Sequence, residues 1–273
     1  MMKIGIQGIK GSYHHKVAQD FFGQDIEVLE CMSFPSLVDA LVDGEVTDAV
    51  MAIENSIAGA ILPNYALLDT HNLTIEGEHY LDIQHSLLAL EGQKIEDIKE
   101  VWSHPMAILQ CRDFFRQYPS IKLVEDTDTA DVAKRIQEKQ LKGIGAIASS
   151  TAAQIYNLTE LATSIQTIKE NATRFFILNN IEKQIASDMD KASIRFTTDH
   201  KRGSLAAILN VLSDCRMNLT KIQSMPVIQT PWHYAFFVDV TFESYELFEK
   251  AIQLIKIMAL DFKVLGAYKN QKR

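Results

Sequence analysis

The chain has 273 residues and a formal net charge of -8, from 27 Lys and Arg against 35 Asp and Glu. This acidic balance excludes nucleic acid or an anionic membrane as the main partner, so any anionic ligand must be held by local groups. With 47% hydrophobic and 23% charged residues the composition is that of a globular protein, and the length predicts about two domains.

The cysteines and the N-terminal residues bear on location and cofactors. Cys31, Cys111 and Cys215 are scattered without a CxxC spacing, so we expect free thiols in a reducing compartment and no zinc site. The N-terminus, MMKIGIQGIKGS, lacks the long apolar segment of a secretory signal, and no apolar run is long enough to cross a bilayer. We therefore expect a cytoplasmic protein. No flavin or nicotinamide fingerprint is present, and we expect no cofactor or metal.

Up to about residue 180 the sequence alternates strand, polar loop and helix. The first helix carries Val17, Ala18, Phe21 and Phe22 on one face, which we expect to be buried. The strand–loop–helix plan recurs at residues 3–23, 26–44, 48–65, 100–111, 122–136 and 143–156. This alternation predicts an α/β fold with mostly parallel strands, whose ligands bind beyond the carboxyl ends of the strands.

Small and hydrogen-bonding residues gather where these strands give way to helices. They are Gly11, Ser12 and Tyr13; Glu54, Asn55, Ser56 and Gly59; Ser103 and His104; Thr127 and Thr129; and Ser149, Ser150 and Thr151. Helix N-termini present unpaired N–H groups, so several of them converging would hold a small anion without a basic patch. The alternative is that these side chains only cap their helices.

After a polar stretch at residues 180–192, expected to be a linker, the organisation changes. Strands alternate with two helices in the order βαββαβ, which predicts a ferredoxin-like fold, and a turn containing Pro231 separates the two middle strands. The helix faces expected in the core are Leu205, Ile208, Leu209 and Leu212, and Leu247, Ala251, Leu254 and Met258.

The motifs stand in an order that resembles bacterial prephenate dehydratase, a catalytic domain followed by an ACT regulatory domain. They are GIKGSYHHKVA, IENSIAGAI, SHPMAILQC, DTDTADVA, AIASSTAAQIYNL and NATRFFIL, and in the second part RGSLAAIL, NLTKIQSMP and WHYAFFVD. The resemblance implies a bilobal catalytic domain like the periplasmic binding proteins, with crossover strands and a cleft between two α/β lobes.

The resemblance also implies domain limits and a reaction. We expect a catalytic domain at 1–180, with lobes at about 1–78 plus 166–180 and at 79–165, and an ACT domain at 193–270. The implied reaction converts prephenate to phenylpyruvate, carbon dioxide and water in phenylalanine biosynthesis. Its barrier lies in expelling hydroxide, so the enzyme must donate a proton or a hydrogen bond to the leaving group.

The strand beginning at ENATRFFIL is entered through polar side chains. Because residues alternate faces along a strand, Asn171, Thr173 and Phe175 share one side and Arg174 points to the other. Thr173 is the candidate donor to the leaving group, as the family's Thr-Arg-Phe signature also implies. Arg174 could hold a substrate carboxylate or tie the strand to the opposite lobe, and the sequence leaves both roles open.

The remaining site residues are assigned to substrate binding. They are Ser12, Tyr13, Asn55, Ser56, Gly59, Ser149, Asn171, Arg174 and Phe175. Glu54 is a second possible acid, although it could equally brace its own loop.

The second domain is expected to bind phenylalanine as a feedback effector. The resemblance implies a site at Gly203, Ser204 and Leu205 with Asn218 and Leu219, lying between paired ACT domains. A homodimer or homotetramer is therefore expected. The family's usual Glu-Ser-Arg-Pro reads here Gln-Ser-Met-Pro at 223–226, which leaves the strength and sign of the regulation open. The first loop also departs from the family pattern, with Ile9 for proline and His14 for serine.

Three alternatives remain. Arogenate could replace prephenate, since the two differ only at a side-chain amino or keto group. A solute-binding protein shares the bilobal fold, but the Thr-Arg-Phe strand argues against it. A non-catalytic amino-acid sensor could carry an ACT domain, but the intact motifs of the first part argue against that.

Overall fold

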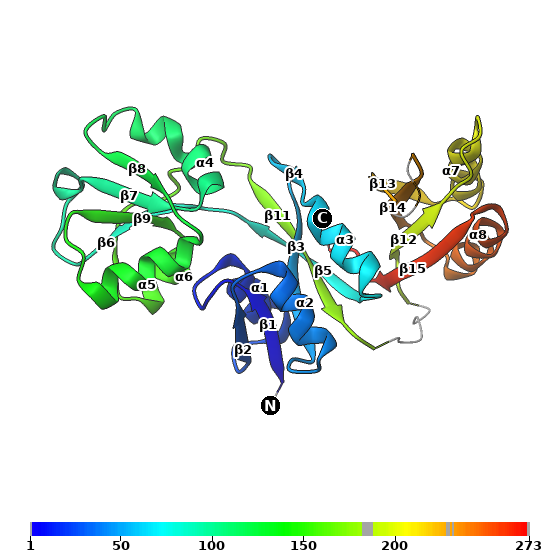
Figure 1. Cartoon of the computed structure of the whole chain (residues 1–273), viewed down its shortest axis with the longest axis horizontal. Coiled ribbons are helices and arrows are strands. Elements are labelled where there is room, and N and C mark those ends of the chain that lie inside the picture. Colours follow the sequence, from blue (N-terminus) through cyan, green and yellow to red (C-terminus); the bar gives the residue numbers. More distant parts are fainter. Residues whose placement is uncertain (1, 182–187, 228–229, 231, 272–273) are drawn as a thin grey trace. The chain divides into compact units, whose positions relative to one another are not determined.

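A computed structural model describes residues 2–181, 188–227, 230 and 232–271 (Figure 1). Contacts divide the chain into two compact units, Met1–Gly59 with Tyr80–Phe175, and Ala60–His79 with Phe176–Arg273. Each unit is thus built from two separate stretches. Residues 182–187 of the expected linker and the expected turn at Pro231 lie outside the described residues.

The first sheet has the order β2-β1-β3-β11-β5, with the short β4 paired to β3. Its strands are β1 (Lys3–Gln7), β2 (Glu27–Cys31), β3 (Asp48–Asn55), β4 (Gly59–Ala60), β5 (Thr74–Asp82) and β11 (Ala172–Asn179). β1 is parallel to both β2 and β3, as the alternation of elements predicts. Helices α1 (Tyr13–Phe22) and α2 (Phe34–Val42) pack on these strands.

The second sheet of the first unit has the order β10-β6-β9-β7-β8. Its strands are β6 (Ser86–Ala89), β7 (Glu100–Ser103), β8 (Lys122–Glu125), β9 (Ile144–Ala148) and β10 (Thr159–Ala162), and its helices are the short η1 (Ile95–Asp97), α4 (Pro105–Phe115), α5 (Thr129–Lys139) and α6 (Ser150–Ile155). Leu88 packs with residues of α5 and α6, whereas its neighbour Leu87 packs with residues of α4. The sheet is therefore covered on both faces, and its strands β6 and β9 are buried almost throughout.

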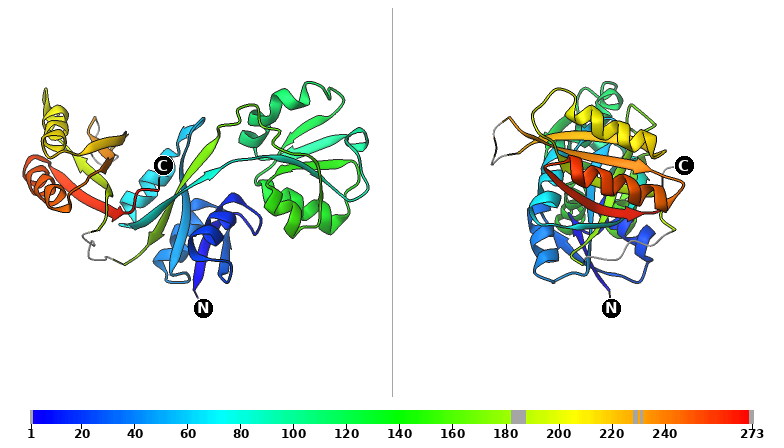
Figure 2. Two further views of the ribbon diagram at one scale, coloured as in Figure 1. Left: turned by 180° about the vertical axis from the view of Figure 1, so that it is seen from behind. Right: turned by 90° about the vertical axis from the view of Figure 1, so that its right-hand side faces the viewer.

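The second unit contains a four-stranded antiparallel sheet of order β13-β14-β12-β15. Its elements are α3 (Leu62–Thr70), β12 (Lys191–Thr197), α7 (Ser204–Asp214), β13 (Asn218–Pro226), β14 (Tyr234–Thr241), α8 (Tyr245–Met258) and β15 (Asp261–Tyr268). The two helices α7 and α8 lie side by side on one face of this sheet (Figure 2). The expected βαββαβ order is confirmed.

Two expected core faces were partly wrong. In α8 the buried residues are Phe248, Ala251, Ile252 and Ile255, while Leu254 and Met258 are exposed. The helix carries apolar side chains around most of its circumference, so spacing alone does not select the face that packs. In α1, Val17 and Ala18 are buried, but Phe21 at the last turn is 37% exposed.

The segment Ala60–His79 packs with the C-terminal sheet. The ring of Tyr65 meets the edge of Phe237 at 5.2 Å between centroids, and the Arg195 guanidinium lies 3.1 Å from an Asp69 carboxylate oxygen. Glu78 on β5 is fully buried and accepts from Lys191 Nζ at 2.8 Å through both carboxylate oxygens. A buried ion pair therefore links the start of β12 to β5.

Candidate active site

Asn55, at the end of β3, is held in one orientation by the backbone. Its Oδ1 accepts from the N–H groups of Ile57 at 3.0 Å and Ala58 at 2.9 Å. Because a backbone N–H can only donate, the atom facing these two groups must be the amide oxygen. The Asn55 Nδ2 group therefore faces β11, where it donates to Asn171 Oδ1 at 2.7 Å and to Thr173 Oγ1 at 3.0 Å.

This arrangement determines what the Thr173 hydroxyl can do. Its oxygen accepts from Asn55, so its hydrogen is left to be donated elsewhere. Within the described residues the structure gives this hydroxyl no acceptor. Thr173 is 9% exposed, and Asn171 beside it is 1% exposed. The predicted sharing of one strand face by Asn171 and Thr173 is seen, since one amide group reaches both.

The hydrogen bonds continue from Asn171 away from Thr173. Asn171 Nδ2 donates to Gln110 Oε1 at 3.0 Å, and the same oxygen lies 3.0 Å from His85 Nε2. His85 Nδ1 lies 2.9 Å from Tyr13 Oη, which is also 2.8 Å from Gln84 O. Burial lowers the pKa of His85 to about 4, with the Gln110 hydrogen bond acting in the opposite direction, and raises the pKa of Tyr13. Both side chains are therefore neutral near pH 7.

Sequence reasoning missed two members of this chain of hydrogen bonds, His85 and Gln110. Gln110 lies within the motif SHPMAILQC, so its polar side chain near the end of an otherwise apolar run was an available signal. His85 follows β5 and precedes β6, and nothing in its sequence neighbourhood distinguishes it.

Other predicted residues join the two α/β halves of the first unit. Ser149 caps α6 and donates to Gly11 O at 2.8 Å, while Ser12 caps α1 by accepting from His15 N–H. A Cβ at Gly11 would lie 3.1 Å from Ala152 Cα, so the loop and α6 approach closely there. Both serines are buried, and each serves as a cap, which was the alternative considered for these junctions.

Arg174 points to the other side of β11, as alternation predicts. Its Nη1 lies 3.3 Å from Glu54 Oε1 and its guanidinium lies over the Tyr80 ring at 5.9 Å. The side chain is 2% exposed and its carboxylate partner is the protein's own. The pair links β11 to β3 within one sheet, and both residues belong to the same expected lobe. The two roles left open by the sequence, holding a substrate carboxylate and tying the strand to the opposite lobe, stay predictions.

Phe175 is buried with its ring edge-on to His14 at 5.0 Å between centroids. His14 Nε2 accepts from Ala52 N–H, and burial lowers the pKa of this histidine to about 3. The histidine that replaces the family's serine is thus a neutral core residue.

Ser56 and Gly59 border the Asn55 turn. Ser56 Oγ accepts from Ala172 N–H at 3.0 Å and the Ser56 N–H donates to Ala172 O at 2.8 Å. Gly59 is exposed with φ +82°, and a Cβ there would meet no atom within 4 Å.

A pocket of about 310 Å³ adjoins the Asn55 turn and α4. It is lined by Ile57, Met106, Leu109, Gln110, Arg112, Asp113, Thr167 and Ile168. Ile57 and Gln110 belong both to this pocket and to the hydrogen bonds around Asn55 and Asn171. The pocket is therefore at the polar cluster, with mainly apolar walls, the Arg112 guanidinium and the Asp113 carboxylate.

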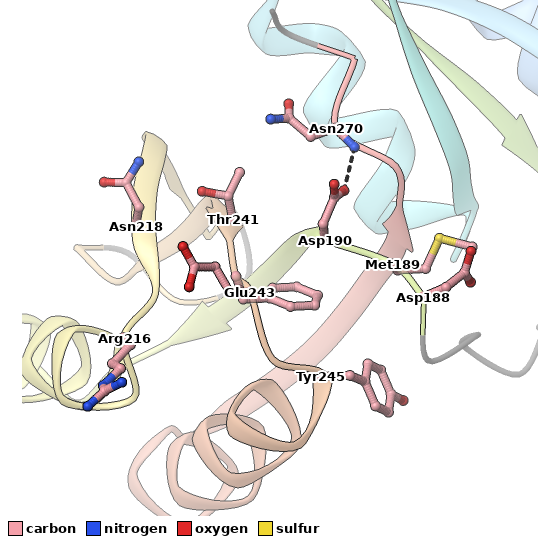
Figure 3. A pocket seen from close by; sticks show the side chains of 10 residues that line it. Asp188, Met189, Asp190, Arg216, Asn218, Thr241, Glu243, Tyr245 and Asn270 are labelled. Atoms are coloured by element: carbon pink, nitrogen blue, oxygen red, sulfur yellow. Dashed lines mark hydrogen bonds between the residues drawn. The ribbon is translucent and has the colours of Figure 1, made fainter.

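The second unit holds a pocket of about 820 Å³ (Figure 3). It is lined by Asp188, Met189, Asp190, Arg216, Asn218, Thr241, Phe242, Glu243, Tyr245 and Asn270. Of the predicted effector residues only Asn218 lines it. Gly203, Ser204 and Leu205 instead lie at the start of α7, where Gly203 has φ +86°, and Leu219 is 37% exposed on β13.

Comparison with known proteins decides the family. The family model for prephenate dehydratase matches residues 4–183. The chain belongs to the prephenate dehydratase family. An arogenate dehydratase 2 of Petunia hybrida is 36% identical over 98% of the chain and 71% of the relative. A bifunctional chorismate mutase/prephenate dehydratase of Buchnera aphidicola is 31% identical over 97% of the chain and 70% of the relative.

Several solved structures share the fold of the whole chain. Prephenate dehydratase of Staphylococcus aureus has a TM-score of 0.84 at 25% identity, covering 98% of this chain and all of that one. The Arthrobacter aurescens enzyme in complex with L-Phe has a TM-score of 0.88 at 23% identity, covering 98% and 90%. A protein described as a novel type of quorum quenching acylase, GqqA, has a TM-score of 0.89 at 26% identity, covering 98% of both chains.

These likenesses confirm the bilobal catalytic domain followed by a βαββαβ domain. The protein is a dehydratase, a carbon–oxygen lyase of aromatic amino-acid biosynthesis. Across the described part of the chain, no group of three His, Cys, Asp or Glu side chains is placed to bind a metal. None of the helices in that part is long and apolar enough to cross a membrane.

Proposed function

We propose that the enzyme removes water and carbon dioxide from prephenate to give phenylpyruvate, with Thr173 as the donor to the departing hydroxyl. The observation that carries this proposal is the fixed Asn55 amide, which donates to Thr173 Oγ1 and leaves the Thr173 hydrogen for another acceptor. Loss of the ring hydroxyl and a carboxylate makes the ring aromatic, so the reaction is downhill once hydroxide can leave.

A threonine hydroxyl is a very weak acid, so its contribution must be a hydrogen bond that strengthens as negative charge develops on the leaving oxygen. Such stabilisation is largest when the donor is already oriented before the reaction. The Asn55 hydrogen bond also makes Thr173 a better donor, because a hydroxyl that accepts a hydrogen bond is polarised toward donating its own.

The remaining roles follow from burial. Ser56 and Gly59 border the exposed side of the Asn55 turn and are proposed to contact substrate together with Asn55. Ser12 and Ser149 are proposed to hold the loop at Gly11 and α6 in place, since their hydroxyls bond within the protein. Tyr13 is proposed to hold the start of α1 against Gln84 and His85. Arg174 and Phe175, which are neighbours on β11 and point to opposite faces of it, are proposed to support the strand because both are buried.

The Thr173→Val variant tests the catalytic assignment. The exchange nearly preserves shape, so the variant should fold while kcat falls by about 10²-fold or more. The measurement is phenylpyruvate formation from prephenate by the purified protein. Thr74→Val, the same exchange at a half-buried position on β5, is the control and should keep its kcat. Unchanged kcat in Thr173→Val would remove the hydroxyl from the mechanism.

Arogenate is the second candidate substrate, because the Petunia hybrida relative named arogenate dehydratase has the higher identity of the two relatives above. Arogenate carries the same leaving hydroxyl and carboxylate, so the Asn55–Thr173 arrangement serves both substrates. Parallel assays with prephenate and arogenate decide between them through the ratio of the two kcat/KM values.

We further propose that phenylalanine inhibits through the second unit. Gly203 opens α7 with φ +86°, and a Cβ there would meet no atom within 4 Å, so a ligand can approach the backbone at this helix start. Phenylalanine should bind in calorimetry and inhibit by 5–150-fold, a typical coupling range, at its weak end because Met225 replaces the usual arginine.

The Gly203→Val variant should lose phenylalanine binding while keeping basal turnover. Gly92→Val is a matched control, because Gly92 also has positive φ, +82°, and open space around a Cβ. Equal inhibition of the Gly203→Val variant and the wild type would show that this loop binds no effector.

The oligomeric state is proposed to be a homodimer or homotetramer. β13 is an edge strand of its sheet and carries Leu219 and Ile222, which are 37% and 41% exposed. An edge strand with exposed apolar residues is suited to pairing with a second copy. Light scattering at assay concentration tests this, and a monomer would contradict it. The cytoplasm is the proposed location, supported by Cys31, Cys111 and Cys215 remaining free thiols.

A further inference from the structure

The hydrogen-bond directions between Tyr13 and Thr173 can be worked out from one fixed point. Asn55 Oδ1 faces two backbone N–H groups, so Asn55 Nδ2 must donate to Asn171 Oδ1. Asn171 then presents Nδ2 to Gln110, which must answer with its oxygen. Turning either amide over would place two donors face to face, which costs the desolvation penalty of unmade hydrogen bonds at buried groups.

The orientation of the Gln110 amide determines which ring nitrogen of His85 carries the hydrogen. The atom 3.0 Å from His85 Nε2 is Gln110 Oε1, which cannot donate, so Nε2 must carry the hydrogen. A neutral imidazole has only one N–H, hence Nδ1 carries none, and the single Tyr13 hydroxyl hydrogen lies between two acceptors, His85 Nδ1 at 2.9 Å and Gln84 O at 2.8 Å. His85 is 3% exposed, and burial keeps it neutral.

We propose that His85, as its Nε2–H tautomer, is a positioning residue for the dehydration: through Gln110 and Asn171 it holds the Asn55 amide against the Thr173 hydroxyl. This inference rests on the proposed role of Thr173. His85 itself touches Gln110 and Tyr13 and stands three side chains away from the hydroxyl, so it acts through other residues.

Gln110 Oε1 shows why the histidine matters. This oxygen accepts from both Asn171 Nδ2 and His85 Nε2, so the two donors fix it from two directions. Without the His85 donor, Gln110 has one fewer restraint, and the Asn171 amide loses the fixed acceptor that keeps its Oδ1 toward Asn55. A misplacement of a reacting group by 1 Å can cost about 10²-fold in rate.

Two amide variants at this position separate positioning from structural support. Counted from Cβ, glutamine places its Nε2 where His85 has Nε2, and asparagine places its amide atoms where His85 has Nδ1. His85→Gln therefore keeps a donor for Gln110 and loses the partner of Tyr13, while His85→Asn does the reverse. Both are small, polar, uncharged replacements at one buried position, so each is the control for the other.

We expect His85→Asn to lose about 10²-fold in kcat with KM little changed, and His85→Gln to stay within about tenfold of wild type. In a Thr173→Val background, His85→Asn should cost nothing further, because the positioned hydroxyl is already absent. The proposal would be overturned if kcat fell equally in both amide variants, or if KM rose while kcat stayed unchanged. It would also be overturned if the effects of His85→Asn and Thr173→Val on kcat were fully additive.

A second measurement does not depend on turnover. Two-bond ¹H–¹⁵N correlation spectra of the wild-type protein report which ring nitrogen of a histidine carries the hydrogen. For His85 we expect the Nε2–H form near neutral pH. The Nδ1–H form would overturn the inference even if the enzyme is fully active. If the expected tautomer is found and neither prephenate nor arogenate turns over, the proposed function fails and the role in dehydration falls with it.

Discussion

The buried ion pair between Glu78 and Lys191 allows a quantitative prediction of how the free energy of unfolding depends on paired charges inside the second unit. Glu78 is 0% and Lys191 1% exposed, and the ammonium lies 2.8 Å from both carboxylate oxygens. The Gln271 N–H adds a third hydrogen bond to Glu78 Oε1 at 3.2 Å. Both charges have lost their hydration, so their mutual contact and these hydrogen bonds must replace it.

Replacing one partner should therefore cost far more than replacing both. Lys191→Met leaves the Glu78 carboxylate buried opposite an apolar side chain, and we expect the free energy of unfolding to fall by about 3–5 kcal/mol. Adding Glu78→Gln removes the uncompensated charge while nearly preserving volume. The double variant should regain most of the loss and can equal the wild type.

Urea unfolding followed by circular dichroism measures the three proteins. Lys250→Met is the control, because Lys250 pairs with Glu246 on the exposed face of α8, and it should leave the midpoint where it is. The reasoning would be refuted if Lys191→Met cost no more than that surface variant, or if the double variant were as unstable as the single one.

Two further predictions concern packing and pH. Gly266→Ala should lower the free energy of unfolding by about 1–3 kcal/mol, because its Cβ would lie 2.0 Å from Ile75 O; unchanged thermal unfolding would contradict this. Burial lowers the pKa of His14 from 6.5 to about 3, so the unfolded chain takes up the proton first as the pH falls. Stability contributed by neutral His14 is thus full above pH 6.5 and is lost as the pH falls toward 3, by up to about 1.4 kcal/mol per pH unit. The His14→Gln variant keeps an acceptor for Ala52 N–H, and its free energy of unfolding should fall less steeply with pH between 6.5 and 3 than that of the wild type. Equal slopes for the two proteins would contradict this prediction.

The strand at residues 171–178 shows how far the sequence reaches. Alternation alone put Asn171 and Thr173 on one face and Arg174 on the other, and both placements are seen. Alternation could not predict which residues contact each face of the strand, because both faces of a buried strand are covered. Glu54 and Asn55 are neighbours on β3, and they meet opposite faces of β11.

His85 was beyond sequence reasoning for a different reason. Its partners Tyr13 and Gln110 are 72 and 25 residues away, and no periodic pattern connects them. Local sequence patterns predicted the strands, the helix caps and the βαββαβ order of the second domain. The chain of hydrogen bonds runs through α1, α4, β3, β11 and the loops before β6 and β11. It therefore depends on how those elements are assembled, which only the structure shows.

The residues Ala60–His79 are synthesised early but find their packing partners late. Tyr65 meets Phe237, and Ile75 meets Gly266, more than a hundred residues further along the chain. At roughly 5–20 residues per second, a ribosome needs on the order of ten seconds or more to synthesise the residues between His79 and these C-terminal partners. Throughout that time α3 and the first half of β5 present apolar surface with no native cover. Nascent chains stalled before residue 190 should therefore recruit chaperones at this segment, and release should require the last strands of the C-terminal sheet.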